Sequence, residues 1–93
     1  MTLHPASAVS TALEEVVEAY RLGMEGQASE HLVKLIDLLT PVLAKGPPEM
    51  VLGITPLLAN AISAIERKDY LYVADIFEYE IAPLLLGITR DAV

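Results

Sequence analysis

Apolar residues recur every three or four positions along almost the whole chain, and this spacing constrains the fold more than any other feature. The first segment predicts a helix over about residues 6–25. Its apolar stripe consists of Val9, Leu13, Val16, Val17, Tyr20 and Met24. Three similar stripes predict helices over about 28–44, 48–67 and 69–86, with a flexible tail at 88–93. No segment has the period-two alternation of an amphipathic strand.

Four helices with short connections predict an all-α protein, folded as an antiparallel four-helix up-down bundle with proline-kinked helix ends. The chain of 93 residues is long enough for one core, so residues 1–93 form a single predicted domain. Gly26 is the expected C-terminal cap of the first helix, and Lys45 with Gly46 is expected to end the second. Asp69 is the expected N-cap of the fourth.

Three similar segments place a proline inside or close to a predicted helix: LLTPVLAKG at 38–46, GITPLLANA at 53–61 and YEIAPLLLG at 79–87. A proline inside a helix removes one hydrogen bond and costs about 3 kcal/mol. Helix three therefore either passes through Pro56 or begins late, with Thr55 as its cap. The kinks either close the ends of the bundle or open a groove for a partner's helix.

The chain carries more apolar residues than four short helices can readily bury. Their share is 54%, yet no run approaches the roughly 18 uninterrupted apolar residues of a membrane span. The N-terminus has neither the basic start nor the apolar stretch of a signal peptide. We therefore expect no membrane contact and expect the surplus to be buried against another chain, most simply as a homodimer.

Charge and residue chemistry argue against several functional classes. The net charge is -7 and the six basic residues are scattered, so nucleic acid is not an expected partner. The absence of cysteine is compatible with a cytoplasmic location. The sequence contains no Gly-rich phosphate loop and no nucleophile elbow. Neither His4 nor His31 belongs to a Glu-x-x-His pair of the kind that binds metal in helical bundles. We expect no enzyme activity, catalytic residue, metal or cofactor.

The segment KDYLYVADIFEYE at 68–80 contains the residues that we expect to bind a partner. Helical spacing places Tyr72, Asp75 and Tyr79 on one outward strip, with Glu78 beside it. Tyrosines on an acidic strip suit a protein interface. The alternative is an ordinary solvated face whose tyrosines cover neighbouring helices.

Glu80 is the second unusual residue of this segment. A regular rotation of about 100° per residue places it on the apolar stripe with Val73 and Phe77. One interpretation is a buried or interfacial carboxylate that fixes helix register or dimer pairing, and the other is an edge residue that reaches solvent.

Five apolar residues off the main stripes also favour a second buried surface: Leu22, Val33, Leu38, Leu71 and Leu86.

The run IERKDYLYVADIFEYEIAPLL at 65–85 resembles the C-terminal part of short, uncharacterised bacterial all-helical proteins associated with motility and cell-surface gene regions. The likeness centres on the KDY, AD, EYE and PLL elements of that run. The size, acidity and bundle form are also similar to those of flagellar export chaperones.

The leading functional hypothesis is a non-enzymatic protein-protein interaction module, chaperone- or adaptor-like, that acts as a homodimer and binds an unidentified protein. The alternative is a small-ligand-binding helical bundle. In that case a pocket would lie beside Tyr70 and Phe77, among the small residues Gly53, Ala61, Ala64 and Ala74.

Overall fold

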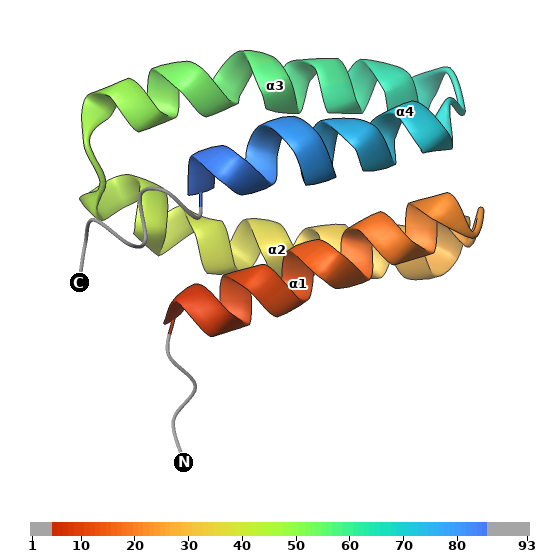
Figure 1. Cartoon of the computed structure of the whole chain (residues 1–93), viewed down its shortest axis with the longest axis horizontal. Coiled ribbons are helices and arrows are strands. Elements are labelled where there is room, and N and C mark those ends of the chain that lie inside the picture. Colours follow the sequence, from red (N-terminus) through yellow and green to blue (C-terminus); the bar gives the residue numbers. More distant parts are fainter. Residues whose placement is uncertain (1–4, 86–93) are drawn as a thin grey trace.

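A computed structural model describes residues 5–85, and within that range the chain is all-α, with four helices and no strand (Figure 1). The first three helices are α1 (Pro5–Arg21), α2 (Glu25–Lys45) and α3 (Pro48–Glu66). The fourth begins as α4 (Tyr70–Asp75) and continues directly into the π-helical segment η1 (Ile76–Ile81). The predicted all-α class is confirmed. Leu86, Gly87 and the predicted tail lie outside the described residues.

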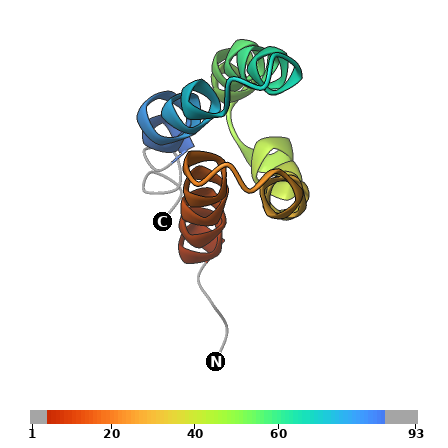
Figure 2. The same cartoon turned by 90° about the vertical axis from the view of Figure 1, so that its right-hand side faces the viewer.

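The helices lie side by side, and consecutive helices run in opposite directions (Figure 1). α1 packs against α2 on one side and against α4 and η1 on the other, while α3 packs against α4 and η1. α2 and α3 are consecutive in sequence but are not a closely packed pair. Viewed end-on, α2 and α3 lie on one side of the molecule, and α1 and α4 on the other (Figure 2).

The fourth helix is buried from two sides because it packs against both α1 and α3. Its fully buried side chains are Val73, Ala74, Ile76, Phe77, Ile81 and Leu85. Val9, Leu13 and Val16 of α1 belong to the same core. From α3 the core receives Ile54 and the small residues Ala61 and Ala64. The short alanine side chains permit close approach of α3 and the fourth helix.

The π-helical turn changes the register of the fourth helix just before Pro83. The backbone N–H of Ala82 donates to the carbonyl of Phe77, five residues earlier. A proline at 83 would clash with the carbonyl of Tyr79 in a regular α-helix, and η1 ends at Ile81, two residues before that proline. Buried positions then follow at 77, 81 and 85.

This register corrects the placement of Glu80. Uniform α-helical rotation put the carboxylate on the apolar stripe, but in the structure Ile81 occupies the buried position and Glu80 is exposed. A buried Glu80 within a single chain is therefore wrong. An interfacial role for Glu80 stays a prediction.

Pro41 and Pro56 are both exposed and lie inside continuous helices. α3 begins at Pro48, so the alternative of a late start capped by Thr55 is wrong. The Thr55 hydroxyl instead donates to the carbonyl of Val51, at 2.6 Å. The Thr40 hydroxyl makes the equivalent bond to the carbonyl of Ile36 in α2, at 2.9 Å.

The turn between α1 and α2 is centred on Gly23 rather than on Gly26. Gly23 has φ of 70°, a left-handed conformation that glycine adopts without steric cost. Its N–H donates to Tyr20 at 3.1 Å and that of Met24 donates to Ala19 at 2.9 Å, which is the Schellman pattern. α1 therefore ends at Arg21, four residues earlier than predicted, and Gly26 lies in α2.

The other two predicted helix ends agree with the structure in position. α2 ends at Lys45 and Gly46 is its C-cap residue. Asp69 occupies the N-cap position of α4, although its side chain makes no capping hydrogen bond. Lys68 precedes it in a left-handed conformation, with φ of 60°, and ends α3 with the same Schellman pattern that Gly23 forms.

Among the described residues α3 is the one helix that is long and apolar enough, by those two criteria alone, to cross a membrane. Core helices of soluble proteins meet the same criteria. However, only 22% of the most apolar window of α3 is buried inside the molecule. Much of this helix therefore has an apolar surface that no other part of residues 5–85 covers.

Phe77→Ala should lower the free energy of unfolding by about 3–5 kcal/mol, because it leaves a cavity between α1, α3 and the fourth helix. Tyr79→Ala is the matched control, since Tyr79 lies in the same π-helical segment but is 67% exposed. Its expected loss is below about 1 kcal/mol. Urea denaturation followed by circular dichroism measures both. Equal losses would contradict this register.

Candidate functional site

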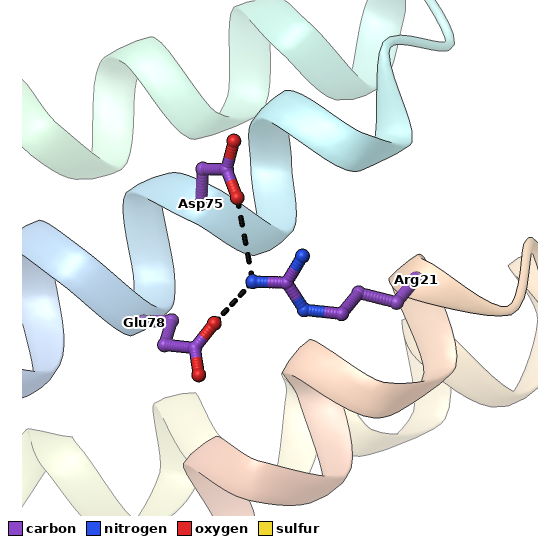
Figure 3. A network of polar contacts seen from close by, with 3 residues as sticks. All are labelled: Arg21, Asp75 and Glu78. Atoms are coloured by element: carbon purple, nitrogen blue, oxygen red, sulfur yellow. Dashed lines mark hydrogen bonds and ion pairs between the residues drawn. The ribbon is translucent and has the colours of Figure 1, made fainter.

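The structure divides the predicted partner-binding strip into two parts. Asp75 and Glu78 lie toward α1, where the guanidinium of Arg21 binds both carboxylates (Figure 3). Nη2 of Arg21 is 3.3 Å from Oδ1 of Asp75 and donates a closer hydrogen bond to Oε2 of Glu78. Tyr72 and Tyr79 are exposed, with 41% and 67% of their surfaces accessible.

The hydrogen bond that Arg21 donates to Glu78 is the main factor that raises the pKa of Arg21, and the negative charge of Asp75 acts in the same direction. All three side chains remain more than a third exposed. Ion pairs in such solvated positions contribute little to stability. The contact instead holds Asp75 and Glu78 at the junction of α1 with the fourth helix.

A groove of about 500 Å³ lies between α1 and η1. Its apolar lining includes Leu13 and Val17 from α1, with Phe77 from η1. Ala82, just after η1, belongs to the same lining. Leu13 and Phe77 are buried core residues, so the floor of this groove is continuous with the hydrophobic core.

Carboxylates surround this apolar floor. Glu14 and Glu18 lie one turn apart on α1, and Glu78 comes from η1 on the other side. Arg21 is the one basic residue of the lining, and it is bound to Glu78. The groove is therefore an apolar channel with an acidic rim.

Of these three carboxylates, Glu78 belongs to the predicted partner-binding strip, whereas Glu14 and Glu18 were not predicted. Their four-residue spacing beside the apolar stripe of α1 was visible in the sequence. This spacing did not show that η1 forms the opposite wall of the groove, because η1 lies some sixty positions further along the chain.

A second polar contact joins three helices at the end where α1, α2 and α4 meet. The hydroxyl of Tyr70 donates to Oε1 of Glu25, and the Tyr70 ring stacks on Tyr20 with 5.7 Å between centroids. The hydrogen bond to Glu25 is the main cause that raises the pKa of Tyr70 to about 12. Burial raises the pKa of Tyr20.

His31 and the small residues of α3 and α4 were the positions considered for a metal or for a ligand in the core. No group of three His, Cys, Asp or Glu residues that could hold a metal occurs in the part of the chain that the structure describes. Nδ1 of His31 is 3.0 Å from Oε2 of Glu15 without forming a hydrogen bond of acceptable geometry. Ala61, Ala64 and Ala74 are buried in the helix packing. His4 lies outside the described residues.

Comparison of the chain with protein-family models, with curated proteins and with solved structures gave no match. Function must therefore be inferred from the groove, the charges and the exposed apolar surface.

Glu25→Gln should lower the pKa of Tyr70 from about 12 toward its ordinary value of 10.0. The raised pKa means that the contact stabilises the fold fully below pH 10 and loses this effect as pH rises through 12. Ultraviolet titration of tyrosinate measures the step. Glu66→Gln, a change of equal charge on α3, should leave it in place. An unchanged step in Glu25→Gln would contradict the assigned contact.

Proposed function

We propose that this protein is a non-enzymatic protein-protein interaction module, adaptor- or chaperone-like, that acts in the cytoplasm as a homodimeric, antiparallel up-down four-helix bundle. Its partner would be a protein that presents an amphipathic helix to the groove between α1 and η1. The observation that carries the proposal is the combination of an apolar floor and an acidic rim in one groove of about 500 Å³.

The length of the groove suits a helix. Its lining on α1 extends from Ser10 to Arg21, a rise of about 17 Å at 1.5 Å per residue. About three turns of a partner's helix fit along that distance. Apolar side chains at positions i, i+3 or i+4 and i+7 of the partner would contact Leu13, Val17 and Phe77.

The charge of the rim selects the class of helix. Glu14, Glu18 and Glu78 contribute three carboxylates, while Arg21 contributes one positive charge at one end. The whole chain has a net charge of -7. A helix whose apolar face is flanked by lysine or arginine therefore complements the groove, and its charges increase the rate of encounter.

The tyrosines of the predicted strip have a place in this proposal. Tyr79 follows Glu78 in η1, and an ionised Tyr79 would raise the pKa of the Arg21 guanidinium, so Tyr79 is within electrostatic reach of that end of the groove. An exposed tyrosine there offers apolar area and a hydroxyl to a bound helix. Tyr72 lies one turn before η1 and would extend the contact surface.

A small cationic amphiphile is the second candidate for the same groove. Its volume lies within the 300–1,000 Å³ that is typical of small-molecule sites. The acidic rim would then bind the cationic group, and the floor its apolar part. The position differs from the pocket expected among the small residues of α3 and α4.

A synthetic peptide of leucine and lysine, with all leucines on one helical face, is the direct probe. The double variant Glu14→Gln, Glu18→Gln should weaken its binding roughly tenfold, because two rim charges are lost. Fluorescence anisotropy with a labelled peptide measures the dissociation constant. A peptide of the same composition in scrambled order should bind more weakly, since its leucines no longer form one face.

The matched protein control is Glu30→Gln, Glu66→Gln, which removes the same net charge from α2 and α3. It should bind like the wild type. Equal effects of the two double variants would reduce the interaction to general electrostatic attraction and contradict a groove site. Equal binding of ordered and scrambled peptides would exclude a helix as the ligand.

A further inference from the structure

α2 and α3 each carry a second apolar stripe beside the one that faces the core. Its members recur at helical spacing, and most of their surface is either exposed or only partly buried. On α2 the stripe consists of Leu32, Ile36, Thr40 and Leu43, and on α3 of Val51, Thr55, Leu58 and Ile62. Leu32, Leu43 and Leu58 also pack against the core, whereas the other five are exposed. We call these eight residues the α2–α3 face.

This face contains no charge. None of its eight residues is charged, and residues 50–65 of α3 include no Asp, Glu, Lys or Arg, although Lys34 and Asp37 lie close to Ile36 in the α2 sequence. Ile36 and Ile62 are nevertheless 48% and 56% exposed. Exposed apolar residues without charge on two consecutive helices are unusual in a chain with a net charge of -7, and such surfaces mark interaction sites.

The two threonines of the face do not interrupt its apolar character. Each hydroxyl donates to the carbonyl four residues earlier in its own helix, Thr40 to Ile36 and Thr55 to Val51. These hydroxyls have an internal acceptor, so a partner need not supply one. The threonine methyl groups remain available for apolar contact.

The same local arrangement occurs on both helices. The segments 39–43 and 54–58 read LTPVL and ITPLL, and their burial matches position by position. The first residue is buried, the threonine and proline are exposed, and the last two are partly buried. Because α2 and α3 run in opposite directions (Figure 1), the face presents one pattern twice in opposite senses.

We propose that a second copy of this chain covers the α2–α3 face, and that this contact forms the homodimer of the proposed function. Two chains that each carry a net charge of -7 repel one another, so they associate best through a surface that places no like charges opposite each other. A two-fold interface uses the same patch on both subunits. An uncharged face can therefore pack against its own copy without placing like charges opposite each other.

The dimensions suit a weak, concentration-dependent dimer. The face spans residues 32–43 of α2 and 51–62 of α3, about 17 Å of each helix at 1.5 Å per residue. Two helices of about 10 Å diameter offer roughly 340 Å² per copy over that length. The total of about 700 Å² is below the roughly 1,200 Å² of stable specific interfaces.

A lipid surface is the competing occupant, because α3 alone meets the length and composition of a membrane span. Two observations favour a second copy. The net charge of -7 disfavours an anionic lipid surface. The face also continues onto α2, which a single span would not include.

Ile36→Asp and Ile62→Asp, made separately in the full chain, test the proposal. Each places two carboxylates in a two-fold interface, so the dissociation constant of the dimer should rise by at least roughly a hundredfold. Sedimentation equilibrium over a concentration series should give twice the chain mass of 10.1 kDa for the wild type. Circular dichroism should show unchanged helix content, since both positions are exposed.

Leu71→Asp is the matched control, because Leu71 is 62% exposed on α4 and lies outside the face. It should remain dimeric. A wild-type dimer that both isoleucine variants leave intact would overturn this face and leave the homodimer standing. A wild-type monomer at every concentration would overturn the face and the homodimer together, whereas peptide binding in the α1–η1 groove is measured independently.

Flotation with phosphatidylglycerol–phosphatidylcholine vesicles distinguishes the lipid alternative. The proposal predicts that the wild-type dimer does not float with the vesicles. If the wild type is monomeric and binds the vesicles, and Ile62→Asp abolishes that binding, then a lipid surface and not a second copy covers the face. If Ile36→Asp loses helix content, the mass of the wild type and that of Ile62→Asp still show whether a second copy covers the α2–α3 face.

Discussion

The packing of the fourth helix between α1 and α3 is the contact on which the rest of the structure depends. Val73, Phe77, Ile81 and Leu85 are fully buried there, and the π-helical turn before Pro83 keeps this succession on the inner side. Burial of an aromatic ring and several branched side chains is the main stabilising term available to a domain of this size. The inner faces of α1 and α3 both pack against this fourth helix.

This packing leaves two surfaces of different character. Between α1 and η1 the core opens into a groove whose floor includes Phe77 and whose rim is acidic. On α2 and α3, which are not closely packed with each other, an uncharged apolar face remains. The first surface selects its ligand by charge, whereas the second suits an identical chain. Separate positions would let one molecule dimerise and bind a partner at the same time.

Helical periodicity was sufficient to predict the four helices, since each of them buries one stripe of side chains. It failed where the backbone departed from regular geometry. Glu80 was misplaced because a π-helical turn changes the register before Pro83, and Gly26 was preferred as a cap although Gly23 has the left-handed conformation. The acidic residues of α1 were missed because a groove depends on which helices become neighbours.

A second copy on the apolar surface of α2 and α3, as proposed, would bring two identical faces together. The chain contains no cysteine, so Ile62→Cys provides a single site for a nitroxide spin label, and pulsed electron paramagnetic resonance then reports distances between subunits. We expect a short intermolecular distance for this label and a longer one for a label at Leu71→Cys. A label at position 62 that shows no dipolar coupling to a second copy, while the labelled chain keeps its helix content, would contradict the proposed contact.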